Sequence, residues 1–376
     1  MNVLALLFAG GTVNAVPELT DVRSMASVPF GCRYRLIDFT LSNIVNAGVS
    51  HVAILTQHNY QSLMDHLGSG KEWDLARRKG GLDILPPFFT VLGPSSVKSL
   101  FTDNIQALLN ARGYLENSSE DTIIVSDCDS VNSLDVGALL RQHEETGADL
   151  TLAVRRTVVE PGNEMIEVVS SDRSGRIREV SNGNDLTRGR KDVSMKFLVI
   201  SKRLLLNILA EMNIHGLTDM AHDFLTRGAK KYNFRVYRHE GYCGTMHTLS
   251  EDFERNMDLL DPDIRAQLFH APGRPVLTKV HNSVPALYQE GCLVRNSLIA
   301  DGCVIEGNVE NCILFRNVHV GKNTSVENCI LMQDTNVEDN VYLNCVVTDK
   351  KVQIRKGRVL SGHQTKPFYI GKFGIV

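Results

Sequence analysis

Residues 3–11 read Val-Leu-Ala-Leu-Leu-Phe-Ala-Gly-Gly, an apolar run that ends in two glycines. A short run without polar interruption is typical of a strand buried on both faces of a parallel sheet, and the glycines are typical of a loop that meets a phosphate. Residues 12–17 then supply no third glycine and no cation. The start of the chain therefore predicts a nucleotide-binding scaffold whose phosphate loop lacks its usual chemistry.

The pattern up to about residue 255 predicts an α/β domain with a mostly parallel sheet, because short aliphatic runs alternate with helical periodicity. Strands are predicted at 3–8, 52–55, 122–126, 150–154 and 197–200, and helices at 37–47, 60–67, 105–115, 136–146 and 202–212. Ligands of such sheets bind beyond the carboxyl ends of the strands. Gly10, Gly11 and the segment 127–129 are expected at that edge.

A different pattern follows a connector marked by Pro and Gly. Val-Glu-Asn-Cys-Ile-Leu occurs at 309–314 and at 326–331, and Tyr-Leu-Asn-Cys-Val-Val occurs at 342–347, a spacing of 16 to 17 residues. Three hexads per repeat are typical of a left-handed β-helix, in which the Asn and Cys positions stack as ladders. We therefore divide the chain into an α/β domain (1–260), a connector (261–285) and a short β-helix (286–376) that docks on the first domain.

Composition narrows the class of protein. The 376 residues carry a formal net charge of −3, so no broad basic surface is expected and nucleic acid is not an expected partner. The eight cysteines contain no CxxC pair, which favours reduced core thiols and a cytoplasmic location. The apolar start is too short for a signal peptide, and no window is long enough to span a membrane.

Several blocks resemble a known family. Val28-Pro29-Phe30-Gly31, Tyr34-Arg35-Leu36-Ile37-Asp38-Phe39, the Ile-Leu-Pro-Pro at 84–87 and the Asn-Met-Asp-Leu-Leu at 256–260 closely resemble bacterial ADP-glucose pyrophosphorylase, also called glucose-1-phosphate adenylyltransferase. The resemblance covers essentially the whole chain. It implies a Rossmann-like nucleotidyltransferase domain before the β-helix, and a reaction of ATP with glucose 1-phosphate, assisted by Mg²⁺, that gives ADP-glucose and pyrophosphate in glycogen biosynthesis.

The resemblance also shows where catalytic groups are replaced. The family's phosphate loop has a glycine and an arginine where this chain has Val13 and Ala15, and a lysine where it has Met25. Of the two aspartates that hold Mg²⁺ in the family, Asp129 is retained and Thr245 replaces the other. Loss of one such group typically costs two to four orders of magnitude in rate. We therefore assign no catalytic residue to this chain and expect Asp129 to be at most a weak metal ligand.

Other family contacts are replaced as well. Lys196 stands at the glycine of a Ser-Met-Gly segment and puts a long side chain where glucose would lie. What remains of the nucleotide crevice is Gly10, Gly11 and Gln57, so ATP binding without turnover is an open alternative. The chain itself is expected to require no cofactor.

Basic residues suggest an effector site. Arg23 and Arg35 match family positions that hold anionic effectors together with basic residues of the β-helix, for which Lys350 and Lys351 are the candidates. Guanidinium groups suit phosphate because their donors form a fixed planar fork. The alternative is that both arginines form structural ion pairs between the domains.

The functional expectation is a regulatory, catalytically impaired subunit, most like the non-catalytic GlgD-type subunit of the family. The resemblance implies a heterotetramer with a catalytic subunit and a phosphorylated metabolite as a possible effector. The alternative is an active but divergent adenylyltransferase of low intrinsic activity. A hexapeptide-repeat acyltransferase is disfavoured, because His319 is its only candidate within the repeats and the large α/β domain has no place in that scheme.

Overall fold

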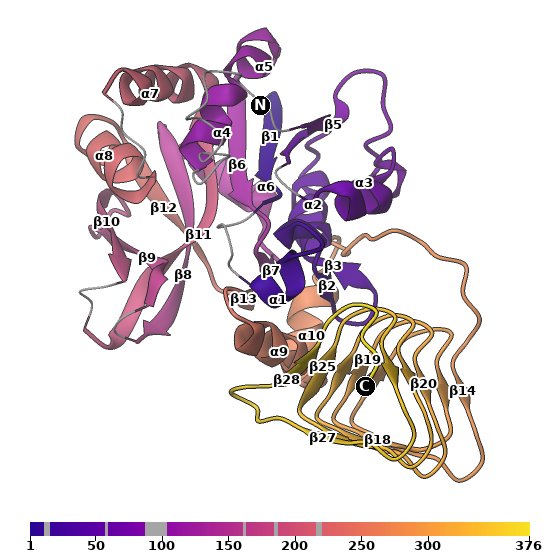
Figure 1. The fold of residues 1–376 in the computed structure, drawn as a ribbon. Helices are drawn as coiled ribbons and strands as arrows, with labels where there is room; N and C mark the ends of the chain where they lie inside the picture. The colour runs from indigo at the N-terminus through magenta and orange to yellow at the C-terminus, as the bar shows by residue number, and fades with distance from the viewer. Residues whose placement is uncertain (11–15, 57–58, 87–103, 161–162, 184–186, 216–219) are drawn as a thin grey trace, which may run out of the picture.

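The structure is a computed structural model, and it describes residues 1–10, 16–56, 59–86, 104–160, 163–183, 187–215 and 220–376. An α/β domain occupies the first two thirds of the chain, and a column of short parallel strands follows and packs against one end of it (Figure 1). The predicted fold class, a nucleotidyltransferase-type α/β domain followed by a left-handed β-helix, is confirmed.

The main sheet contains nine strands among the described residues, in the order β10-β9-β11-β6-β1-β4-β5, with β8 beside β11 and β12 beside β8. The strands are β1 (Val3–Phe8), β4 (His51–Leu55), β5 (Gly81–Leu85), β6 (Thr122–Asp127), β8 (Leu150–Val159), β9 (Asn163–Ser171), β10 (Ile177–Gly183), β11 (Gly189–Ser201) and β12 (Phe234–His239). The predicted parallel pairing holds for β1 with β4 and β6, and for β4 with β5. The sheet is not parallel throughout, because β11 runs antiparallel to both β6 and β8.

Helices cover both faces of this sheet. Leu4, Leu6 and Phe8 of β1 belong to one apolar core, whereas Val3, Ala5 and Leu7 belong to the other, as the alternation of side chains along a strand requires. The α-helices are α1 (Pro17–Thr20), α2 (Leu36–Asn46), α3 (Gln61–Leu67), α4 (Asn104–Asn110), α5 (Arg112–Asn117), α6 (Val136–Glu145), α7 (Lys202–His215), α8 (Arg227–Lys231), α9 (Leu249–Met257) and α10 (Pro262–Phe269).

Two predictions about helices need correction: one predicted helix is divided, and the predicted connector contains a helix. The helix predicted at 105–115 is two helices, α4 and α5, which meet at Ala111. The segment predicted as a connector begins with α10, where Asp261 accepts a hydrogen bond from the backbone of Asp263 and Pro262 occupies the first turn. Proline at the first helical position leaves no backbone donor unsatisfied, so it starts a helix as readily as it marks a loop. No helix among the described residues is long and apolar enough to cross a membrane.

Short elements complete the α/β domain. Two small antiparallel pairs are the hairpin of β2 (Pro29–Phe30) with β3 (Tyr34–Arg35), and β7 (Ser130–Asn132) with β13 (Cys243–Thr245), which are far apart in the sequence. The others are the 3-10 helices η1 (Met25–Ser27), η2 (Lys71–Trp73) and η5 (Asp258–Leu260) and the π-helix η4 (Met220–Thr226). The β7–β13 pair brings Thr245 opposite Ser130, next to the end of β6.

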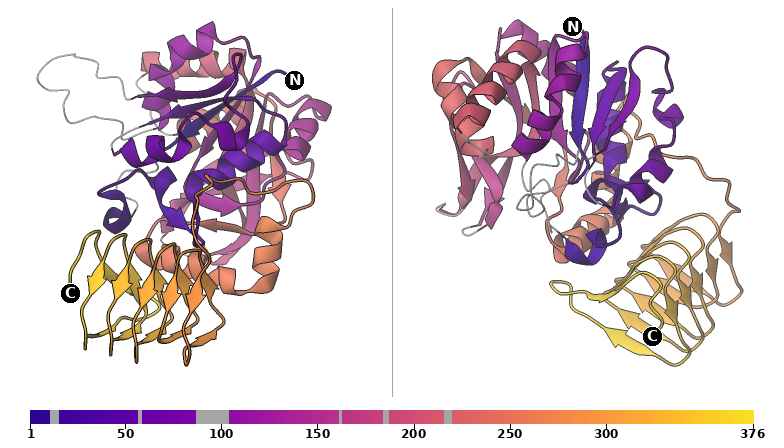
Figure 2. Two further views of the ribbon diagram at one scale, coloured as in Figure 1. Left: turned by 90° about the vertical axis from the view of Figure 1, so that its right-hand side faces the viewer. Right: turned by 45° about the horizontal axis from the view of Figure 1, so that its top comes forward.

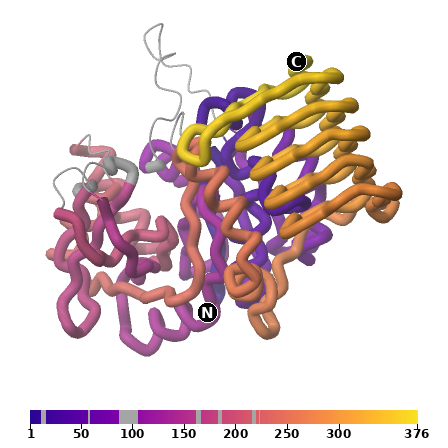
Figure 3. Tube along the Cα trace, turned by 90° about the horizontal axis from the view of Figure 1, so that it is seen from below, coloured from indigo at the N-terminus to yellow at the C-terminus, as the bar shows by residue number. Residues whose placement is uncertain are grey.

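The β-helix has three parallel sheets, and its coils stack side by side along the column (Figures 2 and 3). The first sheet is β14 (Leu287–Tyr288), β17 (Val304–Ile305), β20 (His319–Val320), β23 (Asn336–Val337) and β26 (Gln353–Ile354). The second is β15 (Leu293–Arg295), β18 (Asn308–Glu310), β21 (Ser325–Glu327), β24 (Tyr342–Asn344) and β27 (Val359–Ser361). The third is β16 (Leu298–Ile299), β19 (Ile313–Leu314), β22 (Ile330–Leu331), β25 (Val346–Thr348) and β28 (Phe368–Ile370).

The predicted internal cysteine ladder is confirmed for Cys312 and Cys329, but Cys345 lies outside it, at a coil corner with a φ of +51°, and Val346 takes its place. The backbone N–H of Cys329 donates to the Cys312 thiol over 3.3 Å, and the N–H of Val346 donates to the Cys329 thiol over 3.4 Å. The asparagine positions lie at the corners of the coils instead, half-buried, where the Asn328 amide donates to Asn344 over 3.0 Å. Cys312 and Cys329 are therefore structural, and they are free thiols as expected.

The two domains share an apolar core. Val28, Phe30 and Phe39 of the α/β domain pack in one cluster with five side chains of the β-helix: Ile313, Phe315, Ile330, Met332 and Val347. Met25, which replaces the expected lysine, is also buried in this cluster. An ion pair lies beside it, in which Nη2 of Arg23 donates to both oxygens of Asp349, over 2.7 and 2.8 Å. Both side chains of the pair are almost fully buried.

Replacing one member of this ion pair should destabilise the protein strongly. We expect Asp349→Ala to lower the free energy of unfolding by about 3–5 kcal/mol, because the Arg23 guanidinium would stay buried without its partner. Urea unfolding measures the change. The double variant Arg23→Met/Asp349→Leu removes both charges and should recover most of the loss, so a double variant no more stable than Asp349→Ala would contradict the role of the unpaired charge.

Candidate functional site

The crevice at the carboxyl ends of the strands holds the first candidate site. β1 ends at Phe8, two residues before Gly10, and β6 ends at Asp127, two residues before Asp129. Both aspartates are buried, with 5% and 3% of their surface exposed. Gly11, Val13, Ala15 and Gln57, which sequence analysis placed in the nucleotide crevice, lie outside the described residues.

A lysine side chain lies against these aspartates. The Lys196 ammonium is 3.4 Å from Oδ2 of Asp129 and 3.6 Å from Oδ2 of Asp127. Burial acts to lower the pKa of Lys196, but the carboxylates of Asp129 and Asp127 outweigh it, and the net effect raises this pKa. The lysine therefore stays charged and does not project freely into the crevice as the sequence suggested.

The opposite wall of the crevice carries no second carboxylate at Thr245. Nη2 of Arg155 donates to the Thr245 hydroxyl over 3.3 Å, and Nη1 of Arg155 donates to the carbonyl of Cys243. His247 follows on the same segment and is buried, and burial lowers its pKa. The wall is thus cationic or neutral where the family has an aspartate.

These residues do not fit Mg²⁺. A hard divalent cation needs several oxygen ligands, preferably carboxylates, and here the retained carboxylates already face an ammonium. Within the described part of the chain, no group of three or more His, Cys, Asp or Glu side chains is placed to hold a metal ion.

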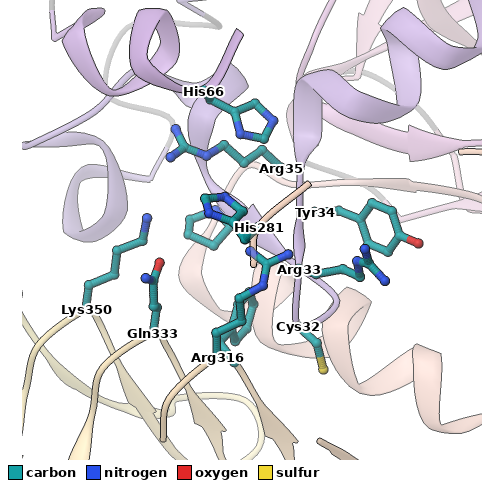
Figure 4. Close-up of a pocket in the computed structure, with 11 residues that line it drawn as sticks. Cys32, Arg33, Tyr34, Arg35, His66, His281, Arg316, Gln333 and Lys350 are labelled. Atoms are coloured by element: carbon teal, nitrogen blue, oxygen red, sulfur yellow. The ribbon is translucent and has the colours of Figure 1, made fainter. Parts of the chain in front are cut away.

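The second candidate site is a cavity of about 60 Å³ between the two domains. Arg316, Gln333 and Lys350 rise into it from the β-helix, and Arg35, His66 and His281 face them (Figure 4). The described lining residues include four Lys or Arg side chains and no carboxylate: Pro29, Cys32, Arg33, Tyr34, Arg35, His66, His281, Phe315, Arg316, Gln333 and Lys350. Such a lining suits a small anion.

The cavity brings together two of the four residues predicted to hold an effector. Arg35 and Lys350 line it, whereas Arg23 and Lys351 do not. Arg23 is occupied by Asp349, as the alternative of an interdomain ion pair proposed, and Lys351 lies 5.7 Å from the centre of the Phe373 ring. The effector role of these residues stays a prediction.

Burial and neighbouring positive charges lower the pKa of basic side chains in this cavity. Burial, together with Arg35 and Arg23 nearby, lowers the pKa of Lys350 from 10.5 to about 7. Burial also lowers the pKa of Arg35 to about 10, and Nη1 of Arg35 donates to the hydroxyl and the carbonyl of Ser62. Carboxylates lie near these side chains but outside the described lining: Asp301 is 3.4 Å from Nε of Arg316, Asp38 acts on Arg35, and Asp349 acts on Lys350. An anion in the cavity would relieve this repulsion.

Sequence analysis missed several lining residues. Arg316, Gln333 and Lys350 are 17 residues apart, so they occupy equivalent corners of successive coils. The repeat period already contained this signal, because every repeat places one residue at the same corner. Arg33 and His281 carried no such signal, since their position depends on how the domains dock. His319, the candidate of an acyltransferase, bonds to Asn336 and Glu306 instead.

The fold and the crevice define a nucleotidyltransferase scaffold joined to a hexapeptide-repeat β-helix. Residues 4–181 match the nucleotidyl transferase family model, and residues 283–376 match the model of a GlmU-like C-terminal hexapeptide domain. The chain belongs to the glucose-1-phosphate adenylyltransferase family, which includes the GlgD proteins of glycogen biosynthesis.

Individual relatives match along most of their length. The glycogen biosynthesis protein GlgD of Bacillus subtilis is 33% identical over 369 residues, covering 96% of this chain and 93% of that protein. GlgD of Geobacillus stearothermophilus is 34% identical, with 85% and 82% covered. The glucose-1-phosphate adenylyltransferase of Halalkalibacterium halodurans is 30% identical, with 86% and 84% covered.

The cavity should bind sulfate in a pH-dependent manner. Lys350 is charged below about pH 7 and neutral above it. Burial lowers the pKa of His66 and of His281, so these rings are neutral over most of the range and add little to its pH dependence. Sulfate keeps its charge of −2 throughout. We therefore expect its stabilising effect in a thermal unfolding assay to be several times larger at about pH 6 than at about pH 8.5.

Neighbouring lysines provide the matched control. Lys350→Met should abolish the pH dependence of sulfate stabilisation, whereas Lys351→Met, one residue away and outside the cavity lining, should retain it. Equal responses of the two variants would contradict the assignment of the cavity as an anion site.

Proposed function

We propose that this chain is a regulatory, catalytically impaired subunit of a glucose-1-phosphate adenylyltransferase, and that it modulates a catalytic partner subunit in glycogen biosynthesis. Its own crevice turns over ATP and glucose 1-phosphate weakly or not at all. Its interdomain cavity binds the phosphoryl group of a metabolite and transmits that binding to the partner. The expected assembly is a heterotetramer in the cytoplasm.

The observation that carries the proposal is the contrast between the two sites. In the crevice, Lys196 neutralises the retained aspartates and Thr245 bonds to Arg155. In the interdomain cavity, basic side chains from both domains converge without a carboxylate in the described lining. Phosphoryl transfer depends on metal and cations around the phosphates, so the first site is poorly equipped for it. Sensing an anion requires converging basic side chains, such as those of the interdomain cavity.

Position supports a regulatory role for the cavity. Its walls come from the β2–β3 hairpin, α3 and the segment before the β-helix on one side, and from successive coils on the other. An anion that draws Arg35 and Lys350 together would alter how the domains pack. Such a ligand biases a domain arrangement, which is what an effector needs in order to act on a neighbouring subunit.

The exposed end of the β-helix supports a partner. Large apolar side chains are exposed along the first coil and the segment before it: Val280, Val284, Leu287, Tyr288 and Leu293. The strands β14, β15 and β16 of that coil are also the outermost strands of their sheets. Unpaired strand edges with exposed apolar side chains are typical of surfaces covered in an assembly. The proposed occupant is a catalytic subunit of the same fold.

Pyrophosphate release from ATP and glucose 1-phosphate tests the proposal. The purified chain alone should be slower than a catalytic family member by at least about two to four orders of magnitude. Adding this chain to its catalytic partner should change the partner's response to effectors. Turnover by this chain alone at the rate of the catalytic subunit would support the alternative of an active, divergent adenylyltransferase.

Substitution of Lys350 tests the effector site in the assembled enzyme. Lys350→Ala should raise the effector concentration for half-maximal response by about tenfold, the effect of one lost charged contact of roughly 1.4 kcal/mol. Lys351→Ala should leave the response unchanged. Size-exclusion chromatography confirms that both variants still assemble. An unchanged response in Lys350→Ala would remove this cavity as the effector site.

A further inference from the structure

Lys196 occupies an unusual place in the sheet. β11 pairs with β8 up to Ser194 and resumes regular pairing at Leu198, and the register shifts between them. Phe197 pairs with Ser126, so Lys196 lies at the level of Asp127, where β6 ends. The shift thus carries the lysine to the carboxyl edge of the central strands, beside the retained aspartates.

The backbone at Lys196 is strained for a lysine. Its φ is +50°, in the left-handed region that favours glycine. Residues with a side chain adopt this region at a cost in free energy, and they persist there when their surroundings compensate. At Lys196 the compensating contact is the ammonium between two buried carboxylates.

We propose that Lys196 is a built-in cation that replaces the divalent metal of this crevice. Its ammonium neutralises Asp127 and Asp129, so the acidic edge of the sheet is stable with no metal bound. The chain thereby keeps the carboxylates of the scaffold while excluding the ion that they would otherwise hold.

Burial and charge support this assignment. Asp127 and Asp129 are almost completely buried, and two buried carboxylates side by side would repel one another without a cation between them. Glu167 also favours the Lys196 ammonium, and the His247 ring, whose pKa burial lowers, lies within electrostatic range of Lys196, Arg155 and Glu251. At Thr245 itself there is no carboxylate for a metal, and the Arg155 guanidinium bonds to its hydroxyl instead.

A second observation concerns the histidine of this wall. Nδ1 of His247 is buried and has no hydrogen-bond partner among the described residues. The ring lies within electrostatic range of Asp129 and Lys196. A divalent ion beside Asp129 would face both the ammonium and this wall. The Lys196 ammonium already supplies a cation beside the two aspartates, so the site does not need a divalent ion.

Removing the lysine should create a metal site. We expect Lys196→Gly to bind one Mn²⁺ at least about tenfold more tightly than the wild-type chain, because the two aspartates lose their internal cation. Electron paramagnetic resonance of free Mn²⁺ measures the affinity. Glycine suits the φ of +50°, so this variant should fold. Lys196→Arg is the control, since it retains the positive charge and should not gain the site.

Thermal unfolding by circular dichroism gives an independent readout. Mn²⁺ should raise the Tm of Lys196→Gly and leave that of the wild type unchanged, and the added variant Asp129→Asn should abolish the gain. Should Lys196→Gly fail to fold, Lys196→Gln carries the same comparison.

Two results would overturn the proposal: a wild-type Mn²⁺ site that depends on Asp129, or a folded lysine variant that gains no affinity. Neither measurement involves turnover or a partner subunit. The outcome bears on the crevice, which the regulatory proposal also uses, whereas pyrophosphate release and the effector response test that proposal separately.

Discussion

The docking of the β-helix against the α/β domain is the constraint on which both candidate sites depend, and its apolar core outweighs its ion pair. Five β-helix side chains enter the shared core. At about 1.5–3 kcal/mol for each buried side chain, they contribute on the order of 10 kcal/mol. The Arg23–Asp349 pair contributes little net stability, because desolvation offsets the attraction of two buried charges. The pair mainly fixes how the two domains dock, because any other arrangement would leave Arg23 without its partner at a cost in free energy.

Position matters because Asp349 precedes Lys350. The ion pair holds one corner of the coil against the α/β domain, and the next residue then faces Arg35 across the cavity. Arg23 and Arg35 both lie close enough to help lower the pKa of Lys350. The same docking that the core stabilises thus concentrates positive charge at one interface. The described lining contains no carboxylate, so an anion in the cavity would relieve this repulsion, and that is the physical basis of the regulatory proposal.

The sequence predicted what depends on local pattern. Strand β1 and the repeats at 309, 326 and 342 were correct because a buried strand and a β-helix coil show their periodicity directly. The pairing of β11 with both β6 and β8 was not predicted, because pairing between strands far apart in the sequence leaves no local signal. The hairpin β9–β10 was also missed, although its two strands are close in the sequence. The break of the helix at Ala111 was also not predicted, because the apolar periodicity continues through it.

Site residues divide in the same way. Arg35 and Lys350 were predicted, and the 17-residue period could have added Arg316 and Gln333. The partner of Arg23 could not be predicted, because Asp349 is 326 residues away and the pairing exists only after docking. The orientation of Lys196 was equally out of reach, since it follows from a positive φ and a shift of register.

The two sites differ in how their charges are balanced, and this difference explains how one fold can lose catalysis while keeping a ligand site. In the crevice, an internal ammonium lies on the aspartates, so that charge is satisfied within the chain. In the cavity, the charges of Arg33, Arg35 and Lys350 have no carboxylate in the described lining, so a ligand from outside is needed to balance them. A site neutralised from within is stable without a metal and has little to gain from one. A site left unbalanced responds to the concentration of an anion, and that response is what regulation requires.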